Sequence, residues 1–385
     1  MSEQAVVIGN VAIPKRRFTR RRGLRGLLTY LPFGVVGLAA GRFGQPYLDG
    51  QLLLLTFPIT IFLAVAIHEL GHLAAARTQG FTIYVFAVGP LCLARRDGRW
   101  RLSRGAGKGI GGFVVSAPRH AHDYRRRRAV VVVAGAVANI TVGLVLVLVA
   151  RDVRFLLTLA EVSLLTGLVQ AVPFSYGGSP SDGRTFLRLL RGGRRGALYE
   201  LVGEINCRVL AGERPREWDR ALIHAMTAIP TELHPDPAAF SYAYLHYFDA
   251  GDLQSAERNL ERAVEVALAR APASAASCVA SLAYFHAYRG EQIEACREAL
   301  DLLRDFGLKP DVLQRLEAAV SLAAGEHEVG RAQAQAALDQ LDKSWLPGLA
   351  RADRDWLENL LAESEAADAA TATSFRPTRA QTLAA

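Results

Sequence analysis

The stretch FPITIFLAVAIHELGHLAAARTQG, residues Phe57 to Gly80, joins a long apolar run to two histidines and a glutamate. An apolar segment of about 20 residues is long enough to cross a bilayer as a helix. Polar and ionisable side chains inside such a segment are costly, and they are uncommon there unless they have a function. The HELGH group at the end of this run therefore determines both the predicted fold class and the functional hypothesis.

HELGH has the spacing of a helical metal site. His68 and His72 are four residues apart, so a helix places both imidazoles on one face. Glu69 is offset toward a water molecule that a metal ion shared by the two histidines would hold. Catalytic zinc binds neutral imidazoles, a third protein ligand and one exchangeable water. The pattern predicts one Zn²⁺ per chain bound by His68 and His72, with Glu69 as the general base.

The apolar residues are concentrated in the first half of the 385-residue chain, of which 51% is hydrophobic. Four segments have the length and composition of membrane spans: Leu27 to Phe43, which is short and contains a proline, Leu52 to Ala76, Ala129 to Ala150, and Phe155 to Phe174. The second half is rich in Ala, Glu, Arg and Leu at helical spacing. We therefore expect an all-α polytopic membrane protein with about four transmembrane helices, followed by a soluble helical domain.

The positive charge predicts how the chain crosses the lipid bilayer. The formal net charge is +8, and the first 26 residues hold seven Lys or Arg while residues 77–128 hold twelve. The two other connections between spans hold only Arg42, Arg151 and Arg154. Because basic residues gather in cytoplasmic loops, we expect a multi-pass protein of the cell membrane with both termini cytosolic. The basic clusters lie beside apolar segments, which favours this role over nucleic-acid binding.

A small β-element is expected between the second and third of the long apolar runs. Residues Phe81 to Val88 are β-branched and aromatic, and the RDG at residues 96–98 separates two strand-like pieces in the manner of a hairpin turn. The element would lie at the cytosolic membrane face. The strands near Phe81 to Val88 could receive an unwound substrate by strand addition. The glycine-rich GAGKGIGGF that follows is interpreted as a flexible segment.

The second half contains a degenerate repeat. Aromatic residues precede Gly251 and Gly290, an alanine follows each glycine by five residues, and a weaker copy surrounds Gly325, so the spacings are 39 and 35 residues. This pattern resembles tetratricopeptide-type helix pairs, which have a period of about 34 and stack into α-solenoids. Such a surface would bind a cytosolic protein or peptide partner. The expected domains are a basic N-terminus over 1–26, an intramembrane core over 27–190, a helical domain over 196–362 and a disordered tail over 363–385.

HELGH at the cytosolic end of a predicted transmembrane helix resembles the site-2 protease family of intramembrane zinc metalloproteases. This family cleaves transmembrane segments of other proteins, so the resemblance implies a membrane-protein substrate. In GAVAN, Gly135 and Asn139 are similar to a Gly-Pro-x-x-Asn motif of the family, with Ala136 in place of the proline. The resemblance implies that Asn139 holds the substrate backbone; the alternative is that its amide serves helix packing.

A second family motif, Asn-x-x-Pro followed by Asp-Gly, is similar to QAVPFSYGGSPSDG. Here Gln170 replaces the asparagine, and nine residues rather than about five lead from Pro173 to Asp182. The resemblance, which covers about residues 50 to 190, implies Asp182 as the third zinc ligand.

Helix depth allows a comparison of Asp182 with the alternative ligand Glu161. At 1.5 Å per residue, His68 lies about 24 Å from the outer end of its predicted span, and Glu161 lies about 9 Å from the outer end of the fourth span. A loop starting near Pro173, about 27 Å down that span, can return Asp182 to the level of His68. This comparison favours Asp182 over Glu161 as the third zinc ligand.

We therefore predict an intramembrane zinc metalloendopeptidase that cleaves transmembrane or juxtamembrane segments of membrane proteins, with Glu69 activating a zinc-bound water. The alternative is a non-catalytic, membrane-anchored scaffold that binds partners through its helical repeats and carries a vestigial metal site. The altered residues at positions 136 and 170 favour this alternative, whereas the presence of all four of His68, Glu69, His72 and Asp182 opposes it. A zinc assay would distinguish the two.

Overall fold

The computed structural model describes residues 5–15, 18, 50–96, 99–104, 111–118, 122–150, 152–176, 179–270, 272–306, 308, 310–342, 344 and 346–374. The predicted span from Leu27 to Phe43 lies outside these described residues. The chain divides into two compact units. The first, here called the apolar unit, comprises residues 21–212 and 218–235, and the second, the helix-pair unit, comprises residues 1–20, 213–217 and 236–385.

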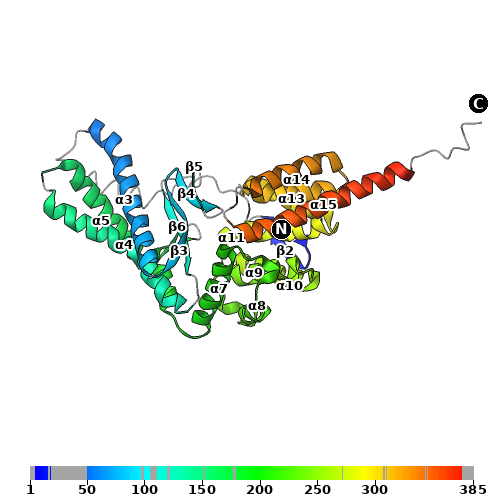
Figure 1. Ribbon diagram of the computed structural model, residues 1–385, viewed down its shortest axis with the longest axis horizontal. Coiled ribbons are helices and arrows are strands. Elements are labelled where there is room, and N and C mark those ends of the chain that lie inside the picture. Colours follow the sequence, from blue (N-terminus) through cyan, green and yellow to red (C-terminus); the bar gives the residue numbers. More distant parts are fainter. Residues whose placement is uncertain are drawn as a thin grey trace, which may run out of the picture. The chain divides into compact units, whose positions relative to one another are not determined.

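Three helices of the apolar unit pack side by side (Figure 1). They are α3 (Gly50–Thr78), α4 (Tyr124–Val149) and α5 (Arg154–Ala171), and each contains a segment long and apolar enough to cross a membrane. Glycines permit their close approach: a Cβ atom at Gly71 would lie 2.6 Å from the carbonyl oxygen of Ala134, and one at Gly167 would lie 2.8 Å from that of Ala136. Small residues at helix contacts are typical of packing in membranes, where burial of apolar surface does not drive association.

Arginines of the RRRR run at residues 125–128 stabilise helix ends. α3 ends where Gly80 adopts a φ of +71°, and the Arg127 side chain donates hydrogen bonds to the Gln79 carbonyl oxygen at this end, one of 2.9 Å from Nε. Arg125 donates from Nε to the carbonyl oxygen of Leu189, in the last turn of α6 (Asp182–Leu190), over 3.0 Å. A cation at a helix C-terminus satisfies exposed carbonyl groups and complements the helix dipole. The sequence predicted only a topological role for this run.

The predicted β-element is a four-stranded antiparallel sheet (Figure 1). Its strands are β3 (Phe81–Val88), β4 (Leu91–Arg96), β5 (Arg99–Arg104) and β6 (Gly112–Pro118), in the order β5-β4-β3-β6. The Phe81–Val88 strand is thus confirmed, but β3 is hydrogen-bonded on both sides, to β4 and to β6. Because β3 is an inner strand, substrate addition at this sheet would have to occur at an outer strand, β5 or β6, and it stays a prediction.

The apolar unit extends further along the chain than predicted. It includes α7 (Gly193–Ala211), α8 (Arg220–Thr227) and the 3-10 helix η3 (Thr231–Leu233). The helical domain was expected to begin at residue 196, but α7 packs on the first turn of α4, where a Cβ atom at Gly203 would overlap the ring of Tyr124. The sequence correctly predicted that this segment is helical. That α7 packs on α4 depends on a contact between residues distant in sequence, which periodicity does not reveal.

The helix-pair unit contains three pairs of helices and a long final helix. The pairs are α9 (Ala238–Asp249) with α10 (Leu253–Arg270), α11 (Pro272–Tyr288) with α12 (Ile293–Phe306), and α13 (Pro310–Ala323) with α14 (His327–Leu341). Gly251, Gly290 and Gly325 occupy the three turns with φ of +80°, +69° and +80°. The repeat spacing thus located the turns, because glycine tolerates positive φ. Assignment to the tetratricopeptide class stays a prediction.

The final helix, α15, spans Pro347–Ser374. The disordered tail predicted from residue 363 is therefore corrected: residues 363–374 continue the helix, and residues 375–385 lie outside the described part of the chain. The AESEAADAATA composition is rich in alanine, which has the highest helix propensity. Arg331 of α14 pairs with Asp368, which attaches the extended part of α15 to its neighbour.

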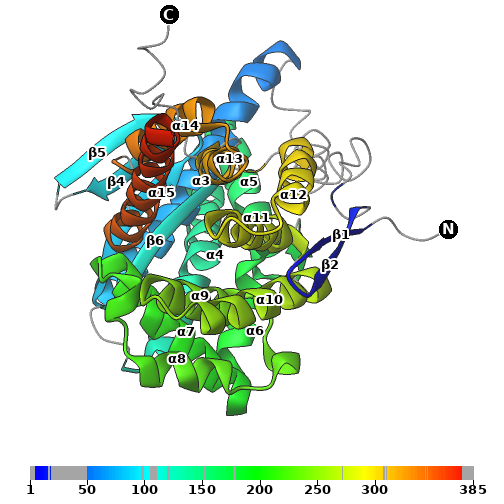
Figure 2. The same ribbon diagram turned by 90° about the vertical axis from the view of Figure 1, so that its right-hand side faces the viewer.

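A basic N-terminus was expected over 1–26, and of this segment the described residues 5–15 and 18 belong to the helix-pair unit. Strands β1 (Ala5–Ile8) and β2 (Val11–Pro14) form a hairpin that packs on α10, α11 and α12 (Figure 2). The Asn10 backbone N–H donates to Oε1 of Glu261 over 2.8 Å. The buried ring of Phe18 meets Phe306 edge-on, with centroids 5.6 Å apart.

A buried ion pair attaches residues 213–217 to the same unit. These residues include the 3-10 helix η2 (Pro215–Glu217). The Arg214 guanidinium donates from Nε and Nη2 to the carboxylate of Asp249 over 2.9 and 2.7 Å, and from Nη1 to Asp355 over 2.6 Å. Asp249 belongs to α9 and Asp355 to α15, so one arginine joins three segments of the unit.

Candidate metal centre

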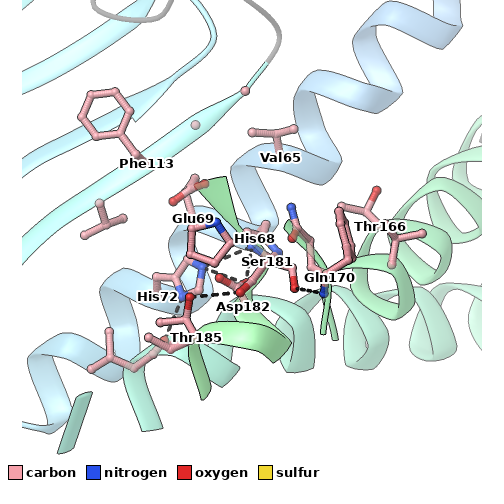
Figure 3. A pocket seen from close by; sticks show the side chains of 18 of the residues that line it. Val65, His68, Glu69, His72, Phe113, Thr166, Gln170, Ser181, Asp182 and Thr185 are labelled. Atoms are coloured by element: carbon pink, nitrogen blue, oxygen red, sulfur yellow. Dashed lines mark hydrogen bonds and ion pairs between the residues drawn. The ribbon is translucent and has the colours of Figure 1, made fainter. Parts of the chain in front are cut away.

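Two histidines of α3 and one aspartate of α6 converge on one point (Figure 3). Nε2 of His68 lies 2.9 Å from Oδ2 of Asp182, and Nε2 of His72 lies 3.3 Å from the same oxygen. The two Nε2 atoms are 3.1 Å apart. Among the described residues, this is the group of His, Cys, Asp or Glu side chains in which three donor atoms lie within 4.8 Å of one another.

The donor set fits a zinc ion. Ligand atoms 2.0–2.1 Å from a tetrahedral zinc are about 3.3 Å from one another, and two imidazoles with a carboxylate form a common catalytic set. Burial raises the pKa of Asp182, but hydrogen bonds from His68 and His72 outweigh burial and lower this pKa to about 2. The carboxylate is therefore ionised, as metal binding requires.

The first turn of α6 holds Asp182 in place. Ser181 is the N-cap: its hydroxyl accepts a hydrogen bond from the Arg184 N–H and donates one of 2.6 Å to the carbonyl oxygen of Val172. A Cβ atom at Gly183 would overlap the carbonyl oxygen of Ala171, so glycine is required for α6 to begin against the end of α5. The Asp-Gly pair thus combines a candidate ligand, Asp182, with the glycine that allows its carboxylate to lie beside the two histidines.

The long connection between Pro173 and Asp182 does not displace the ligand. Its additional residues form a hairpin of two short strands, β7 (Ser175–Tyr176) and β8 (Ser179–Pro180). The Ser181 N–H donates to the Phe174 carbonyl oxygen over 2.9 Å, which closes the base of the hairpin. The departure in spacing is therefore accommodated as a local insertion.

α4 forms the wall behind the two histidines. A Cβ atom at Gly135 would lie 2.5 Å from Nε2 of His72 and 2.8 Å from Nε2 of His68, so glycine is needed there. The carbonyl oxygen of Val131 lies 2.8 Å from Nδ1 of His72. One turn beyond Gly135, Nδ2 of Asn139 lies 3.4 Å from Nδ1 of His68.

Glu69 lies on the other side of the histidines, toward β6 (Figure 3). Its side chain is buried, and a Cβ atom at Gly112 would lie 2.6 Å from Cγ of Glu69, so the glycine makes room for it. His68, Glu69, His72 and Asp182 all line a cavity of about 530 Å³. The rest of the wall consists largely of apolar side chains of α3, α4, α5 and β6, together with polar side chains that include Arg128, Thr166, Gln170 and Thr185.

The structure brings together His68, Glu69, His72 and Asp182, which were the predicted site residues. Asn139 is fully buried behind His68 and is absent from the described residues that line the cavity. Glu161, the alternative third ligand, is outside the cluster.

Sequence reasoning missed three contributors to the site. Ser181 had a signal, because serine before Asp-Gly is a favoured N-cap. Gly112 belongs to the stretch that we interpreted as flexible, and a sequence does not show that a glycine faces a side chain. The Val131 carbonyl group has no sequence signal, since every residue carries one.

Comparison with known proteins agrees with this geometry. The family model of peptidase family M50 matches residues 56–340, most of the chain and all residues of the site. No curated protein and no solved structure matches the chain. A match of this length, on a chain whose His-His-Asp cluster lies among helices apolar enough to cross a membrane, shows that the protein belongs to peptidase family M50, the site-2 protease family of membrane-embedded metalloproteases.

Proposed function

We propose that the chain is an intramembrane zinc endopeptidase that cleaves transmembrane or juxtamembrane segments of other membrane proteins. The observation that carries the proposal is the convergence of His68, His72 and Asp182 on one point beside a buried glutamate. The largely apolar cavity wall favours a peptide segment with apolar side chains. Such side chains can enter the cavity without removing polar groups of their own from water.

The residues of the chain have separate tasks in this mechanism. His68, His72 and Asp182 would hold one zinc ion, which when bound supplies a Lewis acid that makes water a usable nucleophile at neutral pH. Glu69 accepts the proton of the attacking water and delivers it to the nitrogen of the leaving amine. The substrate backbone must be extended at the scissile bond, because helical peptide groups are hydrogen-bonded within their own helix.

The departures from the family motifs are compatible with catalysis. Ala136 lies within the unbroken helix α4, and the inserted β7–β8 hairpin leaves Asp182 beside both histidines. Gln170 lines the cavity, where its amide can contact a bound peptide. These observations favour the peptidase over the scaffold, whose main support was the altered motifs.

The membrane topology is part of the proposal. The hairpin of residues 5–14 belongs to the same compact unit as residues 236–374, so both lie on one side of the membrane. An even number of crossings must then separate them. The described residues contain three candidate spans, and the sequence-predicted span from Leu27 to Phe43 would make four. Together with the distribution of arginines, this supports a topology with both termini and the helix pairs in the cytosol, where the helix pairs would bind a protein or peptide partner.

Substitution of the general base tests the function. Glu69→Gln keeps both histidines but cannot accept a proton, so we expect cleavage to fall by at least about 100-fold while zinc content stays near one per chain. The substrate would be identified as the membrane protein that accumulates uncut in cells carrying the variant. It would then be tested with the purified wild-type protein.

Metal analysis of two further variants completes this test. Asp182→Ala should lose most of the bound zinc, whereas Glu161→Ala should retain it, because only Asp182 lies beside the histidines. Undiminished cleavage by Glu69→Gln would refute the assigned role of Glu69. A wild-type protein that binds no zinc would refute the peptidase and favour the scaffold.

A further inference from the structure

The two histidines of the site meet α4 through their second ring nitrogens. Nδ1 of His72 lies 2.8 Å from the carbonyl oxygen of Val131, and Nδ1 of His68 lies 3.4 Å from the side-chain amide of Asn139. Val131, Gly135 and Asn139 are four residues apart, so they form one stripe on α4 that faces the histidine stripe of α3. Gly135, midway along the stripe, permits this close approach.

The direction of each imidazole ring determines where its proton lies. Both Nε2 atoms face Oδ2 of Asp182, so both rings would present Nε2 to a metal ion. A neutral imidazole that binds metal through Nε2 carries its proton on Nδ1 and needs an acceptor there. The Val131 carbonyl oxygen is such an acceptor for His72.

Asn139 can supply the corresponding acceptor for His68. Its Nδ2 atom faces Nδ1 of His68, while its Oδ1 atom is buried and has no hydrogen-bond partner in the described part of the chain. The oxygen and nitrogen of a side-chain amide exchange positions by a 180° rotation, and they are assigned from the hydrogen bonds they make. The rotated amide directs Oδ1 at Nδ1–H of His68 and satisfies the orphaned acceptor.

We propose that Asn139 is a positioning residue that holds His68 with its proton on Nδ1 and with Nε2 directed at the metal. This inference rests on the proposed zinc peptidase function and gives Asn139 a role toward the metal ligand rather than toward the substrate. Loss of such a partner behind a metal-bound histidine typically weakens metal binding by about 10–100-fold.

The surroundings of Asn139 favour this role over contact with the substrate. The side chain is fully buried and does not line the described part of the cavity. α5 packs directly against it, since a Cβ atom at Gly167 would lie 3.1 Å from Cβ of Asn139. A substrate backbone would reach Asn139 only after separation of α4 from α5, whereas His68 already lies next to it.

The test compares two variants of nearly the same shape in the purified full-length protein. Asn139→Leu removes the acceptor, and Asn139→Asp keeps an acceptor oxygen. We expect Asn139→Leu to bind zinc about 10–100-fold more weakly in competition with a chelator, and Asn139→Asp to bind it within several-fold of wild type. The visible absorption of the cobalt-substituted protein reports ligand geometry and should change in Asn139→Leu but not in Asn139→Asp.

A matched control separates positioning from packing. Ser163 of α5 is also fully buried, and its hydroxyl has no hydrogen-bond partner among the described residues, so Ser163→Ala removes a buried polar group that does not line the described cavity. Its zinc affinity and cobalt spectrum should equal those of wild type. The metal-free forms of all variants should unfold at similar temperatures.

Three results would overturn the proposal. Asn139→Leu with wild-type zinc affinity and reduced cleavage would assign Asn139 to the substrate. Equal loss of zinc affinity in Ser163→Ala would indicate general packing. Absence of zinc binding by the wild-type protein would remove the proposed function as well, and it is distinguished from the other two results because it precedes any substitution.

Discussion

At the residue scale, the geometry of the candidate metal centre depends on glycines as much as on the predicted ligands. Gly135, Gly112 and Gly183 each lie where a Cβ atom would overlap a neighbouring residue: the histidines, Glu69 and the end of α5, respectively. None of the three has a positive φ. The requirement is therefore for space and not for a backbone conformation that only glycine adopts.

A pair of glycine substitutions separates crowding at the metal from crowding elsewhere. Gly135→Ala should weaken zinc binding by at least about 10-fold, because the new methyl group lies where the ring nitrogens of His68 and His72 now lie. Gly143→Ala introduces similar crowding against Leu164 and Ala160 of α5, away from the metal. Both should lower the free energy of unfolding by about 1–3 kcal/mol, as overpacking does.

Zinc competition and thermal unfolding in detergent would measure these two effects. Gly143→Ala serves as the control, with near-normal zinc affinity. If both variants lost zinc equally, the effect would arise from the helix bundle and not from the position of Gly135.

At the scale of elements, the N-terminal hairpin is an integral part of the helix-pair unit. Its tip is held by side chains of two helical segments: the Gly9 N–H donates to Oε1 of Gln292 over 3.0 Å, and Asn10 bonds Glu261. Gly9 has a φ of +59°, as a two-residue hairpin loop requires. Phe18 follows the hairpin and is 2% exposed, so most of its apolar surface is removed from water.

Truncation of that aromatic side chain should loosen the hairpin. Phe18→Ala should destabilise its attachment by about 3–5 kcal/mol, the usual cost of removing a buried phenylalanine side chain. Val7 is 55% exposed in the same hairpin, so Val7→Ala should change stability by less than about 0.5 kcal/mol. Hydrogen exchange of peptides from β1, β2 and α12 would report the difference; equal exchange in the two variants would contradict the packing of Phe18 against Phe306.

At the scale of the whole molecule, residues from both ends of the chain belong to one compact unit, and the helices of the candidate spans belong to the other. The chain therefore leaves the helix-pair unit, forms the site, and returns. The chain thus passes between the two units at more than one point of the sequence. Under the proposed topology, a partner bound to the helix pairs would lie on the side of the membrane that carries both termini.

Cysteine labelling in intact cells tests this topology. Val7→Cys and Val329→Cys place exposed thiols in the hairpin and in α14, and a membrane-impermeant maleimide should label neither until the cells are permeabilised. Val153→Cys, exposed between α4 and α5, should be labelled from outside. Labelling of Val7→Cys and Val329→Cys from opposite sides would contradict the shared unit.

The native cysteines should give little background in this experiment. Burial raises the pKa of the Cys207 and Cys278 thiols to about 11 and that of Cys296 to about 12. Because the thiolate is the reactive form, raised pKa values slow labelling at neutral pH.

The amino-acid sequence by itself determined the features that depend on short-range spacing. The four-residue interval of His68 and His72 placed both on one helix face, the apolar runs predicted α3, α4 and α5, and the recurring glycines located the turns of the helix pairs. The GN pair at residues 9–10, between alternating apolar residues, was also a readable hairpin signal that our interpretation missed. All of these patterns reflect backbone geometry within a few residues.

The tertiary structure alone decided which distant segments meet. It showed that the Val131 carbonyl group supports His72, that Gly112 makes room for Glu69, that β3 is paired on both sides, and that α7 joins α4 while residues 5–18 join α10–α12. Periodicity shows that one face of a helix is apolar, but many other apolar faces could pack against it. A backbone carbonyl group is present in every residue, so the sequence does not show which one accepts a particular hydrogen bond. These pairings follow from the simultaneous packing of the whole chain, which is why no local pattern contained them.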